Sequence, residues 1–271
     1  MADSPPDQPP PAITSSEEVT SAFARVIPAG SLNPNAGRLF GFPYAGTGAA
    51  VFASWRDTGF DAVDVYAAML PGRDGLLRQT PLDSIDVLAE RSADGIAEIV
   101  ATQPGEKRPL ILVGCSFGGI VAFETAHRLT QRGITVDALM VAACRPPHAI
   151  EVTEPVTDLP DEEMVMKLKI WYGAIPDELI RNPEMLKLLL PAIRGDMRAY
   201  ETYQYTERTP LDCPLMAVGG GDDKIISNRH LSDWRRHTRG RFTTRTFAGD
   251  HFFMRTDPRG ALKLIQRRLG L

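Results

Sequence analysis

The residues best suited to nucleophilic chemistry lie in LILVGCSFGGIVAFETA, residues 110–126. Gly114, Ser116 and Gly118 form a Gly-x-Ser-x-Gly pattern between an apolar run and a helical pattern. A strand, a sharp turn and a helix in this order present a serine hydroxyl where free backbone N–H groups stabilise negative charge. The pattern predicts Ser116 as a nucleophile. A glycine-rich turn with a serine N-cap is the alternative reading.

A serine hydroxyl needs a general base to attack at neutral pH, and His251 has the best position for that role. It follows the last predicted strand, Phe242–Phe247, in the sequence RTFAGDHFFM. His148 follows an earlier strand and stays open as a residue that lines the site.

The other three histidines fit the role of base poorly. His127 lies eleven residues after Ser116 on the expected helix, roughly 16 Å away at ~1.5 Å per residue. His230 and His237 belong to the arginine-rich stretch NRHLSDWRRHTRG, and we expect both to be exposed to solvent.

A carboxylate that orients the base is expected after the strand that precedes it. Asp222 and Asp223 directly follow the apolar run Leu215–Val218, and the residues alone leave both open. Asp250 adjoins the histidine, and neighbouring side chains seldom face each other, so we interpret it as an orienting or surface residue. The resulting chain order of Ser, Asp and His is that of the α/β-hydrolases.

Short apolar runs alternate with helical patterns along most of the chain, which predicts a mostly parallel sheet with helices on both faces. The predicted strands are Arg38–Phe42, Ala62–Ala67, Leu110–Val113, Ala138–Ala143, Leu215–Val218 and Phe242–Phe247. The predicted helices are Ser84–Thr102, Phe117–Arg132, Asn228–Thr238 and Pro258–Leu269. We therefore expect one α/β-hydrolase domain over residues 21–271.

Residues 151–208 interrupt this alternation, because they contain helical patterns and no convincing strand. The patterns cover Asp161–Tyr172, Pro176–Ile180 and Pro183–Tyr205, with a break expected at Pro191. We call this segment the helical insertion. A lid over an active site and a helical decoration without function both remain open.

Composition excludes several classes of function. A net charge of -4 argues against a broad nucleic-acid surface. The three cysteines lack metal-ligand spacing, and no apolar run approaches the ~20 residues of a membrane span. Residues 1–20 are acidic and proline-rich without signal-peptide features, which predicts a disordered tail and a cytoplasmic protein.

Together these motifs resemble the type II thioesterases, stand-alone α/β-hydrolases of polyketide and nonribosomal peptide biosynthesis. The resemblance extends from about Phe23 to the C-terminus. Its matching segments are GFPYAGTGAAVFASW (41–55), MLPGRD (69–74), GCSFGGIVAFETA (114–126), LLPAIRGDMRAYETY (189–203), GGGDDKII (219–226) and FAGDHFFM (247–254).

The resemblance implies site residues that the spacing alone leaves open. The family's catalytic aspartate stands at the position of Asp223, which selects it over Asp222. The oxyanion hole would use the backbone N–H groups of Phe117 and Ala45. The sequence departs from the family at three positions that carry no catalytic group: Cys115 replaces a common histidine, and Thr47 and Asp250 each replace a common glycine.

The resemblance also implies the reaction, which is thioester hydrolysis through an acyl-enzyme without a cofactor or metal. The substrate would be an acyl or aminoacyl group on the phosphopantetheine arm of a carrier-protein domain, removed to unblock an assembly line. An acidic carrier could dock on exposed arginines, although a solvated charged face is the simpler interpretation of each. The five candidates are Arg194, Arg198, Arg235, Arg236 and Arg239. A product-releasing thioesterase or acyltransferase of the same pathway, or a non-catalytic binding protein, is the alternative.

Overall fold

A mostly parallel β-sheet forms the centre of the computed structural model, which describes residues 22–27, 37–58, 63–102 and 108–269. The predicted tail at residues 1–20 lies outside the described residues. The strands are β1 (Phe23–Ile27), β2 (Gly37–Phe42), β3 (Val63–Ala68), β4 (Leu110–Cys115), β5 (Ala138–Ala142), β6 (Leu215–Gly220) and β7 (Phe242–Phe247). Within the described residues they form one seven-stranded sheet in the order β1-β3-β2-β4-β5-β6-β7.

All neighbouring strands pair in parallel except β1, which runs antiparallel to β3. The prediction of a mostly parallel sheet is therefore confirmed. The edge strand β1 was not predicted from the sequence.

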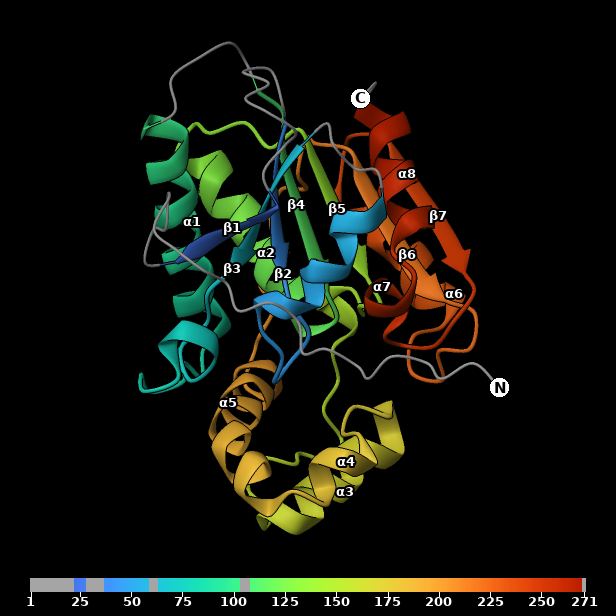
Figure 1. Ribbon diagram of the computed structural model, residues 1–271. Coiled ribbons are helices and arrows are strands. Elements are labelled where there is room, and N and C mark those ends of the chain that lie inside the picture. The colour runs from blue at the N-terminus through green and yellow to red at the C-terminus, as the bar shows by residue number, and fades with distance from the viewer. Residues whose placement is uncertain (1–21, 28–36, 59–62, 103–107, 270–271) are drawn as a thin grey trace, which may run out of the picture.

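Helices cover both faces of the sheet (Figure 1). One face packs against α1 (Ile85–Thr102), α2 (Phe117–Gln131) and α6 (Asn228–Asp233). The other packs against the 3-10 helix η1 (Ala49–Thr58), α7 (Phe253–Thr256) and α8 (Arg259–Leu269). Side chains of β4 alternate between the two cores, with Leu112 in the first and Ile111 and Val113 in the second. A strand buried on both faces needs such a continuous apolar run.

The helical insertion lies between β5 and β6 and projects beyond the carboxyl ends of the parallel strands (Figure 1). It contains α3 (Asp161–Tyr172), α4 (Asp177–Ile180) and α5 (Pro183–Glu201). Its apolar side chains form a small core of their own, which includes Met164, Leu168 and Ile193.

The break expected at Pro191 is wrong, because α5 continues through it. Proline in a helix leaves the carbonyl four residues earlier without its donor. That residue is Lys187, which is exposed, so water can satisfy its carbonyl. Beyond the proline, Ala192, Ile193 and Asp196 are buried. The packing of these side chains outweighs the free-energy cost of a proline inside the helix.

Three-residue and four-residue 3-10 segments complete the fold. They are η2 (Asp74–Leu76), η3 (Pro147–Ala149) and η4 (Trp234–His237). The last of these ends what the sequence predicted as one helix to Thr238. Among the described residues, no helix is both long enough and apolar enough to span a bilayer.

Candidate active site

Ser116 lies on the turn between β4 and α2, with a φ of 51°. This left-handed backbone is uncommon for a side chain other than glycine and marks a strained position. The two flanking glycines are required because no side chain fits at either position. A Cβ on Gly114 would lie 2.2 Å from the Gly118 carbonyl oxygen, and a Cβ on Gly118 would lie 2.3 Å from the Phe42 carbonyl oxygen. The sequence therefore folds into the sharp turn that the motif predicts.

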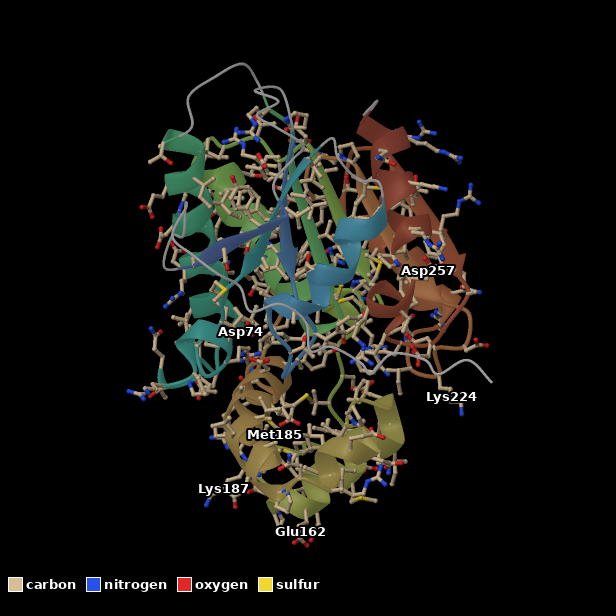
Figure 2. The ribbon with its side chains drawn as sticks, viewed as in Figure 1. Asp74, Glu162, Met185, Lys187, Lys224 and Asp257 are labelled. Carbon is tan, nitrogen blue, oxygen red and sulfur yellow. The ribbon has the colours of Figure 1, made fainter. Side chains whose placement is uncertain are left out.

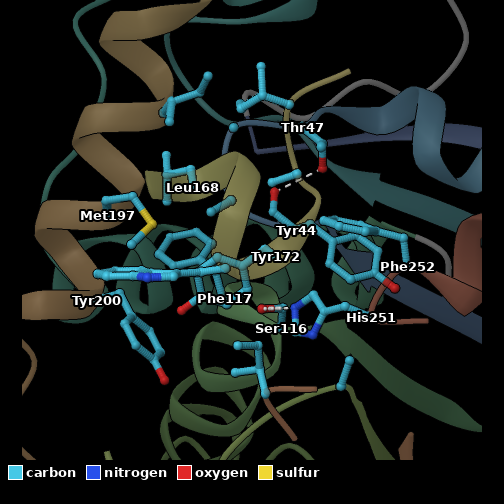
Figure 3. Close-up of a pocket in the computed structure, with 18 of the residues that line it drawn as sticks. Tyr44, Thr47, Ser116, Phe117, Leu168, Tyr172, Met197, Tyr200, His251 and Phe252 are labelled. Atoms are coloured by element: carbon cyan, nitrogen blue, oxygen red, sulfur yellow. Dashed lines mark hydrogen bonds between the residues drawn. The ribbon is translucent and has the colours of Figure 1, made fainter. Parts of the chain in front are cut away.

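The structure brings Ser116, His251 and Asp223 into one hydrogen-bonded chain, of which Figure 3 shows the contact between Ser116 and His251. His251 Nε2 lies 3.0 Å from Ser116 Oγ. His251 Nδ1 lies 2.8 Å from Asp223 Oδ2. The His251 and Asp223 side chains are 5% and 0% exposed. Three side chains from loops after three different strands thus meet at the carboxyl edge of the sheet.

Asp223 is held by backbone as well as by the histidine. Its Oδ1 accepts hydrogen bonds from the N–H groups of Ile225 at 2.8 Å and Ile226 at 3.0 Å. Burial opposes the charge, but the His251 contact and these two backbone bonds outweigh it and lower the pKa of Asp223. Asp222 is exposed, so the structure places only Asp223 against the histidine.

Aromatic rings surround His251, and the sequence alone predicted a role for none of them. The ring centroids of Tyr44, Tyr172 and Phe252 lie 5.9, 5.4 and 5.2 Å from that of His251. Tyr44 and Phe252 lie within the quoted segments 41–55 and 247–254, whereas no local signal marks Tyr172 on α3. These rings restrict access of water to the imidazole and limit its reorientation.

Ala45 and Phe117 both line the cavity that contains Ser116, and the backbone N–H group of each is a candidate oxyanion donor. Among the described residues, neither group donates a hydrogen bond to a protein acceptor. Phe117 is the first residue of α2, so its N–H is one of the free donors at a helix start. Two free donors beside a serine hydroxyl are the arrangement that an oxyanion hole requires.

A cavity of about 520 Å³ opens above Ser116 and extends beneath the helical insertion (Figure 3). Its wall on the side of the insertion is largely apolar and includes Leu168, Ile193 and Met197. Polar and charged side chains also border it, among them Arg145, Glu151 and Arg255. A cavity of this size accommodates a small-molecule group.

The remaining histidines lie away from the cavity. His148 Nδ1 is 2.7 Å from His237 Nε2, and the His237 ring in turn packs against Phe123. His127 packs against the same ring. The expectation that His237 is exposed is wrong, since it is buried beneath Trp234 and Tyr205. The aromatic rings around His237 stabilise it in a buried position, although the sequence nearby is rich in arginine. His230 is half-buried and caps the start of α6.

The residue before the serine, Cys115, is fully buried in the core beneath η1 and α8. Burial raises the pKa of its thiol to about 12, so it stays protonated at neutral pH. Asp250 Oδ1 accepts from the Phe252 N–H at 2.8 Å and so braces the loop that carries His251. Among the described residues, no three His, Cys, Asp or Glu side chains are grouped to hold a metal ion.

The sheet, its helical layers and the Ser116 turn define an α/β-hydrolase. The family model described as "Thioesterase domain" matches residues 37–269, and the chain belongs to this thioesterase family. The predicted fold and the predicted class of hydrolase are thereby confirmed.

The proteins similar to this chain include a solved type II thioesterase, in agreement with the resemblance drawn from the sequence. The type II thioesterase BorB from the borrelidin biosynthetic cluster has a TM-score of 0.82 and 33% identity, covering 94% of this chain and all of that one. Thioesterase PikA5 of Streptomyces venezuelae is 33% identical, over 80% of this chain and 75% of its own length. The protein named linear gramicidin dehydrogenase LgrE, of Brevibacillus parabrevis, is 33% identical over 85% of this chain and 87% of its own length.

Proposed function

We propose that this thioesterase hydrolyses acyl or aminoacyl thioesters on the phosphopantetheine arm of carrier proteins, and that it edits a polyketide or nonribosomal peptide assembly line. The observation that carries the proposal is the continuous contact from Asp223 through His251 to Ser116, at 2.8 and 3.0 Å. The biosynthetic clusters named for its relatives support the choice of substrate.

Acylation begins with the Ser116 hydroxyl donating to His251 Nε2. Asp223 accepts from Nδ1–H, which leaves Nε2 as the acceptor and stabilises the imidazolium that forms. Ser116 Oγ bonds to the thioester carbonyl carbon while its proton moves to His251. The tetrahedral intermediate then expels the pantetheine sulfur, which takes that proton and departs as a thiol.

The developing oxyanion receives hydrogen bonds from the N–H groups of Ala45 and Phe117. Loss of one such donor costs an enzyme of this kind about 3 kcal/mol of transition-state stabilisation. In deacylation His251 removes a proton from water, which attacks the acyl-Ser116 ester. The acid and the free serine are the products, so the chemistry needs no cofactor and no metal.

The helical insertion serves as a lid in this proposal. Its Leu168 and Met197 border the cavity on the side opposite the catalytic loops, so the acyl group would contact them (Figure 3). The apolar wall favours acyl chains over strongly charged groups. The insertion therefore contributes to which acyl groups are removed.

The five arginines considered for carrier docking all contact acceptors of their own chain. Arg194, Arg198, Arg236 and Arg239 pair with Asp161, Asp158, Glu207 and Asp212 in that order, and Arg235 donates to the Thr238 carbonyl oxygen. Apart from Arg194, these pairs are solvent-exposed and contribute little to stability. The carboxylates of an acidic carrier can replace exposed partners of this kind. We therefore propose these arginines as docking residues.

Hydrolysis of a panel of carrier-bound acyl groups tests the proposal. Acetyl, propionyl, octanoyl and aminoacyl carrier proteins are incubated with the enzyme and with Ser116→Ala, and the freed carrier is measured by mass spectrometry. We expect turnover of several short units by the enzyme and none by the variant. Unchanged turnover by Ser116→Ala contradicts the catalytic assignment.

The same panel separates the alternatives. A strong preference for one elaborate full-length chain indicates product release instead of editing. Transfer of the acyl group to a nucleophile other than water indicates an acyltransferase. No turnover and no labelling by a serine-directed fluorophosphonate indicates a binding protein without chemistry.

A further inference from the structure

Asp196, on helix α5 of the helical insertion, lies against the loop that carries the Ala45 N–H. We infer that Asp196 is a positioning residue that holds this N–H in place as an oxyanion donor, so that the lid and the oxyanion hole are mechanically one unit. The inference deepens the proposed function and rests on it, since it takes Ser116 as the nucleophile and Ala45 as a donor.

The Asp196 carboxylate is buried, with 1% of its side chain exposed, and three N–H groups donate to it. Arg73 Nη1 lies 2.5 Å from Oδ2 and Arg73 Nη2 lies 2.8 Å from Oδ1, a two-pronged ion pair. The Gly46 N–H donates to Oδ2 at 2.7 Å. A buried carboxylate with this set of donors has one orientation, because any rotation would leave a charged group unpaired.

Hydrogen bonds lead from this ion pair to the peptide that carries the Ala45 N–H. Arg73 Nη1 also donates to the Thr47 carbonyl oxygen at 3.1 Å. Thr47 in turn donates twice to the Tyr44 carbonyl oxygen, from its N–H at 3.1 Å and its Oγ1 at 2.8 Å (Figure 3). The Tyr44 carbonyl and the Ala45 N–H belong to one planar peptide, so fixing the first orients the second.

The neighbouring peptide is fixed directly. The Gly46 N–H belongs to the peptide that follows Ala45, and Asp196 accepts from it. Gly46 has a φ of 71°, and a Cβ there would lie 2.5 Å from Ile193 Cγ1 on the same helix α5. Helix α5 therefore contacts the loop closely enough to require glycine, and both peptides around Ala45 depend on it.

A second carboxylate braces the far end of the loop. Asp74 Oδ2 accepts from the Ala49 N–H at 2.9 Å, and the residue lies where the helical insertion meets the rest of the molecule (Figure 2). Asp74 comes from the same turn as Arg73. The loop is thus held from one side by the turn after β3 and from the other by the lid.

The test replaces Asp196 by asparagine, which keeps the shape and removes the charge and one acceptor. We expect kcat for acyl-carrier hydrolysis to fall about 10²-fold with KM within about twofold, because an oxyanion donor acts in the transition state. The rate of labelling by a fluorophosphonate should fall as well, since its phosphoryl oxygen occupies the same hole.

The matched control is Asp64→Asn. Asp64 forms a similar, nearly buried ion pair with Arg108 at the amino ends of β3 and β4, whereas the loop follows the carboxyl end of β2. Both variants should lower Tm, but only Asp196→Asn should lower kcat. Equal loss of kcat in both, or wild-type kcat in a folded Asp196→Asn, overturns the inference.

A double variant, Arg73→Met with Asp196→Leu, covers the case in which the single variant does not fold. Apolar replacement of a buried ion pair often preserves stability, but it leaves the Gly46 N–H and the Thr47 carbonyl without their partners. We expect a Tm near that of the wild type with kcat still reduced at least tenfold. Wild-type kcat in this folded protein contradicts the inference.

Failure of the proposed function gives a different result. Wild-type enzyme that reacts with the fluorophosphonate but releases no acyl group from any carrier contradicts carrier hydrolysis. The labelling rates of the variants then still decide whether Asp196 positions the oxyanion donor.

Discussion

His251 Nδ1 lies 2.8 Å from Asp223 Oδ2, and the second oxygen of that carboxylate is occupied by two backbone N–H groups. The carboxylate therefore cannot turn away from the imidazole without breaking two further bonds. This arrangement selects the tautomer with the proton on Nδ1 and leaves Nε2 to face Ser116. In asparagine at position 223 the two backbone N–H groups would keep the amide oxygen, so the amide NH2 would face His251 Nδ1 and favour the wrong tautomer.

We therefore expect Asp223→Asn to lower kcat by about 10³- to 10⁴-fold with little change in Tm. The neighbouring variant Asp222→Asn is the control, because that side chain is exposed, and its kcat should equal that of the wild type. Steady-state hydrolysis of an acyl carrier measures both. Equal kcat values for the two variants would contradict the role of Asp223.

The cavity wall should set the range of acyl groups. Met197 and Leu168 both line the cavity beside Ser116 (Figure 3). The variant Met197→Trp therefore adds side-chain volume to the cavity and narrows it. We expect kcat/KM for octanoyl carrier to fall about tenfold or more, since each methylene excluded from an apolar site costs about 0.8 kcal/mol. Acetyl carrier should be turned over as before. A uniform loss for both substrates would place the acyl group elsewhere.

Buried histidine should make the fold sensitive to acid. His127 packs on Phe123, and its Nε2 has no hydrogen-bond partner among the described residues. Burial, aided by Arg208, lowers its pKa from 6.5 to about 4 against the opposing charge of Glu124. The unfolded chain thus binds a proton between about pH 6.5 and pH 4 that the folded protein does not, and stability falls as the pH drops through this window.

His127→Leu should remove this contribution. We expect its unfolding free energy to depend less steeply on pH, by up to 1.36 kcal/mol per pH unit and about 3 kcal/mol in total between pH 7 and pH 4. Urea unfolding at several pH values measures the difference. Parallel curves for wild type and variant would show that His127 does not titrate in this range.

Local pattern was enough to predict most of the strands and helices. Continuous apolar runs such as Leu110–Val113 and the turn residues beside Ser116 carry strong local signals, and the structure places them as expected. The two aspartates at 222 and 223 carry the same local signal, so only the family resemblance separated them. Which of them faces His251 depends on the turn that directs the Asp223 side chain to two backbone N–H groups.

Other features depend on contacts between distant segments. Arg73 and Asp196 are 123 residues apart, and nothing in either local sequence pairs them. His237 is buried because the rings of Phe123, Tyr205 and Trp234 pack around it, and two of these residues are distant in sequence from the arginine-rich stretch. Helix α5 continues through Pro191 because the side chains on one face of the helix are buried against the rest of the molecule. In each case tertiary packing outweighs local preference.

In the proposed mechanism Ser116 takes the acyl group from the thioester. The most direct measurement is an acid quench of the enzyme during turnover of a radiolabelled acyl carrier, followed by peptide mapping. We predict the acyl group on Ser116, with none on the adjacent Cys115, and no adduct in Ser116→Ala. An acyl group on Cys115, or turnover by Ser116→Ala, would contradict the role of Ser116 as the nucleophile.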